Sequence, residues 1–200
     1  MAYRGPKAKV ARSLDLAVTP KTQKILERRK FPPGQHGMSR KKNAGVYKQQ
    51  LVEKQRLKFT YNISEAQLAK TYYEANRRDG STGDNLMCLL ESRLDALVYR
   101  AGFARTIFAA RQYVAHGHFQ VNGQRSFSPN RIIKPNDLIA AREKSKNHPQ
   151  IKEAVEGAPE APNYLAVNKD KFEAKLVNVP LRDQIPVKLN EQLVVEYYSK

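Results

Sequence analysis

The residues best suited to chemistry are basic side chains in the segment 93–141, beside the junctions between its predicted helices and strands. This segment predicts two helices set at an angle against a small sheet, which leaves one edge exposed. Arginine guanidinium groups and backbone amides on such an edge can donate hydrogen bonds to phosphate oxygens. A-form RNA helices close their deep major groove to side chains and are recognised by shape, phosphates and 2′-hydroxyls. The pattern therefore indicates binding of folded RNA, and its basic members are Arg93, Arg100, Arg105, Arg111, His116 and His118.

A catalytic or metal site built from the same residue types is disfavoured by the spacing. His116 and His118 could join Cys88 as metal ligands, but they straddle a predicted helix-to-strand turn and no partner spacing supports coordination. Asp95 has no acid partner nearby in sequence for general acid–base work. Residues 81–83 lack the glycine-rich lead and the Lys-Ser/Thr pair of a phosphate-binding loop. No catalytic residue, metal ligand or cofactor is predicted.

Two helices are expected to position the basic side chains. Leucines at three- and four-residue spacing predict a helix over residues 84–101. On that helix Arg93 and Arg100 are seven residues apart, nearly two turns, so both should project from one side. The second helix should be capped near Thr106 and end at Gly117.

A small sheet is expected after the second helix. Residues 118–121 alternate like a strand, and Asn122-Gly123 is the strongest short signal of a hairpin. Segments 131–134 and 138–141 supply further strands. The stretch 156–163 is polar and punctuated by proline and glycine, so it is interpreted as a linker.

Helical spacing also governs the segment before this module. Apolar residues between Gly45 and Arg78 predict two amphipathic helices, with Ser64 as the N-cap of the second. Segments 164–167 and 193–198 have the composition of strands. One face of the first helix is basic, and its position next to a strongly basic N-terminus favours phosphate contact over a merely solvated face. The members of that face are Lys48, Lys54, Arg56 and Lys58.

Charge is concentrated at the N-terminal end. The chain of 200 residues carries 36 Lys and Arg against 19 Asp and Glu, a net charge of +17. Residues 1–60 alone hold 16 Lys and Arg against 3 acids, a net charge of +13. This composition predicts an extended basic arm, helical only at 22–30, that orders only on a polyanion. The partner indicated is nucleic acid or an anionic membrane surface.

Several classes of protein are excluded. No apolar run approaches the roughly 18 residues of a membrane span, and the first residues contain no apolar block of signal-peptide length. The single cysteine, Cys88, cannot form an internal disulfide and fits a reducing compartment. The expected location is therefore the cytosol.

Residues 90–123 resemble the RNA-binding module named after the small ribosomal subunit protein four family. Pseudouridine synthases and a tRNA synthetase also own this module, but they attach it to catalytic domains much larger than the space left here. The resemblance to the ribosomal family extends in order along nearly the whole chain. Further matching segments are 32–37 (PPGQHG), 50–55 (QLVEKQ), 82–86 (TGDNL), 93–95 (RLD), 111–112 (RQ), 116–118 (HGH), 121–123 (VNG) and 198–200 (YSK).

The expected fold class is α+β. A mainly helical N-terminal domain carries the extended basic arm, and a small α-L RNA-binding module, two helices on a small antiparallel sheet, is inserted into it. The expected divisions are 1–45 for the arm, 46–90 for the helical domain, 164–200 for the C-terminal return that completes it, 91–155 for the inserted module and 156–163 for the linker.

The chain departs from the family pattern at a few positions. Its N-terminal arm lacks the cysteines that bind zinc in some members, so zinc is not expected. The arginine usual after the Gly-Phe turn is Ile107, and the acid two residues later is Ala109. The usual Tyr-Gly at the helix joint is Tyr61-Asn62. These differences bear on individual RNA contacts, above all on a phosphate contact at position 107.

The resemblance implies a structural, non-catalytic protein of the small ribosomal subunit. It implies binding of ribosomal RNA at a multi-helix junction early in assembly, contact with neighbouring ribosomal proteins and a contribution to translational accuracy, with no membrane, small-molecule substrate or homo-oligomer. A free RNA chaperone or RNA-modification accessory protein, and an architectural DNA-binding protein, are the alternatives. The expected rRNA-binding residues are Arg4, Lys7, Lys9, Arg12, Gln35, His36, Arg40, Lys41, Lys42, Lys48, Lys54, Arg56, Lys58, Arg93, Arg100, Arg105, Arg111, Gln112, His116, His118, Asn122 and Gly123.

Replacing Lys41 and Lys42 with alanine is expected to weaken RNA binding and to flatten its dependence on salt, because each lysine that meets a phosphate releases counterions. Thermal stability of the free chain should hardly change. Binding titrations at several salt concentrations and thermal melts without RNA check this. A large loss of thermal stability would contradict an arm that is unfolded without RNA.

Overall fold

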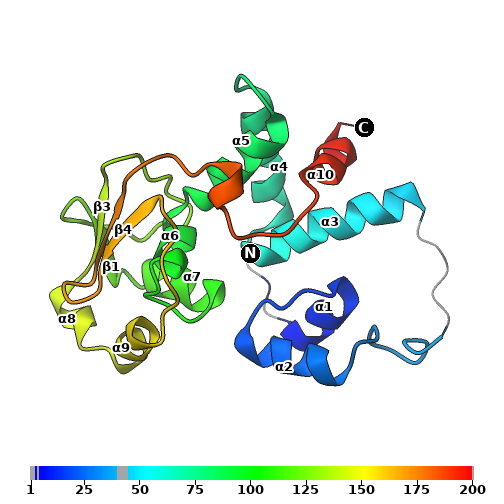
Figure 1. Ribbon diagram of the computed structural model, residues 1–200, viewed down its shortest axis with the longest axis horizontal. Helices are drawn as coiled ribbons and strands as arrows, with labels where there is room; N and C mark the ends of the chain where they lie inside the picture. Colours follow the sequence, from blue (N-terminus) through cyan, green and yellow to red (C-terminus); the bar gives the residue numbers. More distant parts are fainter. Residues whose placement is uncertain (1–2, 4, 40–44, 200) are drawn as a thin grey trace. The chain divides into compact units, whose positions relative to one another are not determined.

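The computed structural model describes residues 3, 5–39 and 45–199, and the chain divides into two compact units. The helical unit comprises the residues up to Gly83 together with those from Lys188 onward, and the sheet unit comprises Asp84–Val187. Helices and one antiparallel sheet make the fold α+β, as expected (Figure 1). Within the described part of the chain, no helix is long and apolar enough to cross a membrane.

Among the described residues, five helices lie wholly in the helical unit, and their ends follow local signals. Ser64 precedes the fourth of them and accepts a hydrogen bond from the backbone N–H of Gln67 at 3.3 Å, which confirms the predicted N-cap. Buried apolar residues of this unit include Leu57, Tyr61 and Leu68. The helices are α1 (Lys7–Leu14), α2 (Pro20–Arg28), α3 (Val46–Thr60), α4 (Glu65–Asn76) and α10 (Glu191–Tyr198).

The last of these helices, α10, corrects a prediction, because residues 193–198 were expected to form a strand. The apolar residues of this segment also fit a helical face. Val194 is fully buried, and the ring of Tyr198 stacks on Tyr72 with centroids 4.9 Å apart. Gln50 of α3 donates to the carboxylate of Glu196 at 2.8 Å. Packing against α3 and α4 therefore decides the helix over the local strand propensity.

The basic N-terminal segment contains more helix than the single stretch predicted at 22–30. Helix α1 buries Val10, Ala11 and Leu14. Helix α2 begins earlier than expected, because Thr19 caps it through a hydrogen bond from the backbone N–H of Thr22. The prediction of an arm that orders only on a polyanion is therefore wrong for these two helices. Residues 40–44 of the arm lie outside the described part of the chain.

The sheet unit holds a five-stranded antiparallel sheet with strand order β2-β1-β3-β5-β4. A strand expected at 131–134 is absent from the described structure, where only an isolated bridge joins Ile132 to Arg93. The strands are β1 (Phe119–Val121), β2 (Gln124–Arg125), β3 (Leu138–Ala141), β4 (Leu165–Asn168) and β5 (Glu173–Leu176). The helices of the unit are α5 (Thr82–Glu91, which starts in the helical unit), α6 (Leu94–Arg100), α7 (Ile107–Ala115), α8 (Glu143–Lys146), α9 (Pro149–Glu156) and the 3-10 turn η1 (Arg182–Gln184). Figure 1 shows α6, α7, α8 and α9 near the strands.

Strands β4 and β5 belong to the sheet unit, whereas the sequence assigned 164–200 to the helical domain. β5 pairs with β3, and Leu165, Ala174 and Leu176 are buried in the same core as the helices α6 and α7. Only the residues from Lys188 onward return to the helical unit. The apolar faces of β4 and β5 explain the difference, because they need the core that the sheet supplies.

The helix predicted over 84–101 is interrupted at Ser92 and Arg93. Ser92 O accepts from the N–H of Ile133 at 2.8 Å, and the N–H of Leu94 donates to Arg131 O at 2.9 Å. These bonds hold Arg93 in an extended conformation between α5 and α6. Leucines on both sides of the break stay buried, so helical spacing alone does not reveal it.

Positive backbone angles mark two turns of the sheet unit. Asn122 and Gly123 have φ values of 51° and 78°, which confirms the predicted Asn-Gly hairpin between β1 and β2. Gly102, after α6, has a φ of 79°, and a Cβ at this position would meet the Cβ of Ala158. Helix α7 then starts at the predicted cap, since Thr106 accepts from the N–H of Ala109 at 3.2 Å.

Replacing Gly102 with alanine is expected to lower the free energy of unfolding by about 2–4 kcal/mol, because backbone strain and a clash with Ala158 add together. Gly123→Ala is the matched control, since Gly123 also has a positive φ but nothing lies within 4 Å of its added Cβ. It should cost only about 1 kcal/mol. Urea unfolding of both variants measures the difference, and equal losses would contradict the packing role of Gly102.

Candidate nucleic-acid interface

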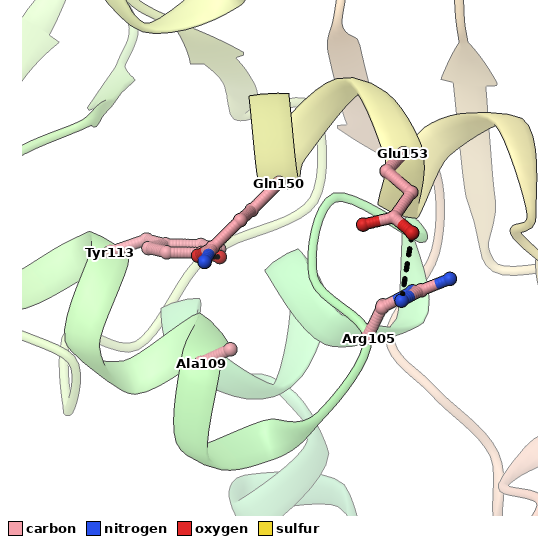
Figure 2. Close-up of a pocket in the computed structure, with 5 residues that line it drawn as sticks. All are labelled: Arg105, Ala109, Tyr113, Gln150 and Glu153. Atoms are coloured by element: carbon pink, nitrogen blue, oxygen red, sulfur yellow. Dashed lines mark hydrogen bonds and ion pairs between the residues drawn. The ribbon is translucent and has the colours of Figure 1, made fainter. Parts of the chain in front are cut away.

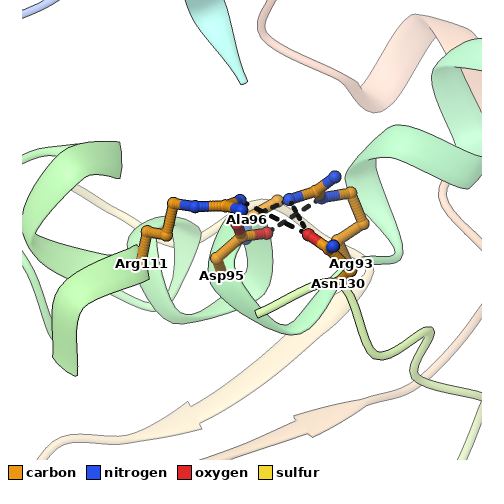
Figure 3. A network of polar contacts seen from close by, with 5 residues as sticks. All are labelled: Arg93, Asp95, Ala96, Arg111 and Asn130. Atoms are coloured by element: carbon orange, nitrogen blue, oxygen red, sulfur yellow. Dashed lines mark hydrogen bonds and ion pairs between the residues drawn. The ribbon is translucent and has the colours of Figure 1, made fainter. Parts of the chain in front are cut away.

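Arg93 and Arg111, both predicted to bind RNA, share the buried carboxylate of Asp95 (Figure 3). Arg93 donates from Nε to Oδ1 at 3.0 Å and from Nη2 to Oδ2 at 2.6 Å, and Arg111 donates from Nη1 to Oδ2 at 3.0 Å. The amide oxygen of Asn130 accepts from both arginines, at 2.8 and 3.3 Å. Asp95 also accepts from the N–H of Ala96, so both carboxylate oxygens are hydrogen-bonded.

This network is internal. The side chains of Arg93 and Asp95 are 4% and 1% exposed, and that of Arg111 is 19% exposed. Burial lowers the pKa of Arg111, while the charge of Asp95 opposes that effect. The extended residue between α5 and α6 places the Arg93 guanidinium beside Asp95 in the first turn of α6. The sequence predicted that Arg93 and Arg100 project from one side of a single helix. In the structure, Arg93 instead pairs with the internal carboxylate of Asp95.

Arg100 has a similar environment at the other end of α6. It forms an ion pair with Glu91, which is fully buried, and Tyr164 donates its hydroxyl to the same carboxylate at 2.7 Å. Burial, together with the negative charge of Glu91, raises the pKa of Tyr164. The Arg100 side chain is 14% exposed, so it connects α5, α6 and the residue before β4 inside the unit.

Arg105 differs from the other predicted arginines because it is exposed. It pairs with Glu153 of α9 at 3.0 Å, with side-chain exposures of 61% and 57% (Figure 2). The pair borders an open cavity of about 210 Å³ that Ala109, Tyr113 and Gln150 also line. Surface pairs of this kind contribute little to stability, so Arg105 can exchange Glu153 for a phosphate at small cost.

The positions that depart from the family pattern have structural explanations. Ile107 is buried at the start of α7 and packs inside the sheet unit, so position 107 carries no phosphate contact. Ala109 lines the small cavity beside Arg105. At the joint of α3 and α4, Asn62 adopts a φ of 48°, a conformation that asparagine tolerates in place of glycine.

The Asn122-Gly123 turn is exposed, but its asparagine side chain is used internally. Its amide nitrogen donates to Asp137 at 2.8 Å, and its oxygen accepts from the N–H of Leu138 at 2.8 Å. These bonds fasten the turn to the start of β3. Gln112, also predicted to bind RNA, is exposed on α7.

Three histidines gather where α7 ends. The ring of His118 lies 6.2 Å from that of His116 and 5.6 Å from that of His148, measured between centroids. Arg125 of β2 reaches the same place, where it donates to the carbonyl oxygens of Gly117 at 3.2 Å and of His116 at 3.3 Å. His116 and His118 were predicted to bind RNA, and the structure brings them together.

Sequence reasoning missed His148, Arg125 and Arg142 as neighbours of these two histidines. The Asn-Gly turn could have revealed Arg125, because a two-residue hairpin returns the next strand toward the residues before β1. No local signal identifies His148, since its position depends on how α8 and α9 pack.

The basic face predicted on α3 is partly internal. Lys54 is 4% exposed, binds Glu65 at 2.8 Å and lies 4.7 Å from the ring centroid of Tyr197. Lys58 binds the other oxygen of Glu65 at 3.3 Å. Burial by itself raises the pKa of Glu65, but hydrogen bonds from Lys54, Tyr198 and Lys58 hold that pKa below its usual value.

The other members of that face differ in exposure. Arg56 donates to the backbone oxygen of Leu14 at 2.7 Å and pairs with Glu53, so it fastens α3 to α1. Lys48 is exposed near the start of α3. Of the four residues predicted on this face, Lys48 is thus the one that the structure leaves fully at the surface.

The predicted residues of the N-terminal segment are also divided. Arg12 donates to the backbone oxygens of Phe31 and Pro32, both at 3.0 Å, and stacks over the Phe31 ring. Lys7 is half-buried on α1. Exposed residues of the segment are Lys9, Gln35 and His36. Four predicted residues, Arg4, Arg40, Lys41 and Lys42, lie outside the described part of the chain.

No arrangement for metal coordination is found in the described part of the chain. Among residues 3, 5–39 and 45–199, no group of three or more His, Cys, Asp or Glu side chains could hold a metal ion.

Comparison with known proteins assigns both parts of the chain. Residues 2–91 match the model of the ribosomal protein S4/S9 N-terminal domain, and residues 92–139 match the model of the S4 domain. The chain is 49% identical over 199 residues to the small ribosomal subunit protein uS4 of Streptomyces avermitilis. That alignment covers 98% of this chain and 97% of the relative. It is 46% identical over 198 residues to the uS4 protein of Geobacillus kaustophilus, with coverage of 99% and 98%.

Replacing Asp95 with asparagine is expected to lower the free energy of unfolding by about 3–5 kcal/mol, because Arg93 and Arg111 lose the carboxylate that compensates their buried charges. Glu153→Gln is the control, since it removes the carboxylate of an exposed pair and should change stability by less than about 1 kcal/mol. Urea unfolding followed by circular dichroism measures both. An Asp95→Asn variant as stable as the parent chain would contradict the structural role of this network.

Proposed function

Since this chain belongs to the uS4 family of small ribosomal subunit proteins, we propose that it is a structural, non-catalytic constituent of the small ribosomal subunit that binds its ribosomal RNA. The observation that carries the proposal is the match over 98–99% of the chain, which includes both the N-terminal family domain and the S4 domain. The family is structural, and it places the chain on ribosomes in the cytoplasm.

The distribution of charge supports RNA as the partner. The helical unit holds 21 Lys and Arg against 8 Asp and Glu, a net charge of +13, whereas the sheet unit holds 15 against 11, a net charge of +4. The helical unit therefore supplies most of the attraction to the phosphate backbone. The sheet unit contributes fewer charges at defined positions, as expected for a module that recognises RNA shape.

Exposure divides the predicted binding residues by role. We propose that Lys9, His36, Lys48 and Arg105 contact RNA directly, because their side chains are exposed and their charges are not committed to buried partners. The same role is proposed for the remaining exposed or undescribed members of the predicted set. The buried and internally bonded members act as positioning residues that hold the surface in shape, and they are Arg12, Lys54, Arg56, Lys58, Arg93, Arg100 and Arg111.

The finer role is also a proposal. We infer that binding occurs at a junction of several RNA helices early in subunit assembly, and that the chain contributes to translational accuracy beside neighbouring ribosomal proteins. Two compact units joined by a short return give two surfaces, which suits a protein that holds separate RNA helices. As a functional division we propose the basic segment 1–45, the helical domain from residue 46 with its C-terminal return from Lys188, and the inserted module between them.

Sedimentation of a lysate at low magnesium tests the proposal. The chain is expected to migrate with the isolated small subunit in stoichiometric amount. Recovery only at the top of the gradient would overturn the proposal in favour of a free RNA chaperone. Equal affinity for small-subunit RNA and for duplex DNA of equal length would instead favour an architectural DNA-binding protein.

Replacing both Lys9 and Lys48 with alanine is expected to lower the slope of log affinity against log salt concentration by about 0.7–0.9 for each phosphate contact removed. Lys169→Ala is the control, because Lys169 is exposed in the turn between β4 and β5 and does not belong to the predicted set. Filter binding to transcribed small-subunit RNA at several salt concentrations measures the slopes. An unchanged slope in the double variant, or an equal decrease per lysine in the control, would contradict the proposed contacts.

A further inference from the structure

Three imidazole rings and the guanidinium group of Arg125 come together at the C-terminal end of α7. We call His116, His118 and His148 the histidine cluster; its two ring-centroid separations from His118 are 6.2 and 5.6 Å. Arg125 reaches the cluster from β2. Arg142, after β3, is joined to it by its backbone N–H, which donates to His118 O at 3.0 Å. The three histidines and two arginines come from four separate segments of the sheet unit.

The charged groups that face His118 are all cationic. Burial lowers the pKa of His118, and so do the charges of His148, His116, Arg125 and Arg142, in decreasing order. The neutral groups against it are the Tyr113 ring of α7 and the Ser145 hydroxyl of α8, which lies 3.0 Å from Nδ1. The carboxylate on α8, Glu143, is 86% exposed and pairs with Lys146 instead.

Basic side chains that lie together without a carboxylate favour the binding of an anion. Their mutual repulsion costs free energy in the unliganded chain, and a bound anion removes that cost. A cation is disfavoured at the same place, and no metal-binding group of His, Cys, Asp and Glu occurs within residues 3, 5–39 and 45–199. The backbone carbonyls at the end of α7 further favour the protonated imidazoles.

Several donors of this group remain available for a ligand. The Nδ1 atom of His148 is buried and has no hydrogen-bond partner in the structure. Two nitrogens of Arg125, Nε and Nη2, donate to backbone carbonyls, and its Cζ lies 4.3 Å from the ring centroid of Phe127. The side chain is nevertheless exposed. A guanidinium has five N–H donors, so three of those of Arg125 stay uncommitted by these bonds.

We propose that the histidine cluster, together with Arg125 and Arg142, binds one phosphodiester group of the RNA and takes up at least one proton when it does so. The inference rests on the proposed function, because it assigns a ligand group and a protonation step to the sheet unit of an RNA-binding protein. The only bond that changes in the chain is the N–H bond of the protonated imidazole, whose proton comes from the solvent and returns to it when the RNA leaves.

Linkage fixes the direction of the effect. In the free chain, burial and the basic groups around His118 lower its pKa and so favour its neutral form. A bound phosphate favours the protonated imidazole, so the pKa of His118 is higher in the complex than in the free chain. Affinity is therefore highest at low pH and falls as pH rises through the pKa of the complex. Uptake of one proton changes affinity at most tenfold per pH unit, so uptake over half of the range gives a loss of about tenfold between pH 6 and pH 8.

RNA affinity of the full chain at pH 6 and pH 8, at constant salt, tests the proposal. The probe is transcribed small-subunit RNA, and the variants are His148→Gln, which removes no internal side-chain hydrogen bond, and His118→Asn, which keeps a polar atom near Ser145. Each variant should reduce the tenfold difference to about threefold or less. Lys169→Gln is the control, because it removes an exposed cation that lies outside both the cluster and the predicted RNA-binding set, and it should retain the pH dependence.

The outcomes separate the two proposals. A parent chain that binds RNA equally at both pH values, or a pH dependence that both cluster variants retain in full, would overturn the inference and leave RNA binding intact. A chain that binds no small-subunit RNA at either pH would overturn both proposals.

A second measurement avoids any effect of substitution on folding. Proton NMR of the histidine rings in the parent chain, titrated with inorganic phosphate as the probe, reports the pKa of each imidazole. Phosphate should raise the pKa of His118 and should shift the ring signals of the cluster more than that of His36, with the variants supplying the assignments. An equal response of all four histidines would indicate general screening and would overturn the site.

Discussion

The buried carboxylate of Asp95 is the interaction on which the geometry of the sheet unit depends. It accepts hydrogen bonds from Arg93 before α6 and from Arg111 on α7, and both arginines also donate to the amide oxygen of Asn130 in the segment before β3. A charge without solvent is costly unless it is paired and fully hydrogen-bonded, so these groups must meet in one arrangement. That requirement fixes where α6 begins and how α7 is oriented on it, and thereby places Arg105 and the histidines that follow α7.

The basic residues of this chain consequently do two different jobs. Lys54, Arg93 and Arg100 are neutralised inside their units by Glu65, Asp95 and Glu91, and they hold helices together. The acidic residues used in these pairs are not available at the surface to offset the remaining lysines and arginines. Each of these pairs is neutral by itself, so the net charge of +17 comes from the remaining lysines and arginines, which outnumber the remaining acids.

Local signals predict the parts of the structure that depend on neighbours in sequence. Ser64 and Thr106 cap helices through amides three residues away, and Asn122-Gly123 turns the chain by its own backbone preference. The break at Arg93 and the burial of its side chain depend on residues 129–133, so helical spacing cannot reveal them. The helix at 191–198 depends likewise on packing against α3 and α4. The family and the fold class were predictable because long motifs carry them, whereas exposure separates contact residues from positioning residues only in three dimensions.

The discontinuous helical unit has a consequence for synthesis. Its final helix, α10, is encoded after the entire sheet unit, yet Val194 and Tyr198 complete the core formed with α3 and α4. During translation the sheet unit has all its residues once Val187 has emerged, while the earlier helices still lack their last partner. The helical unit therefore begins first and is completed last. The apolar faces of its helices that α10 covers stay exposed while the sheet unit is synthesised.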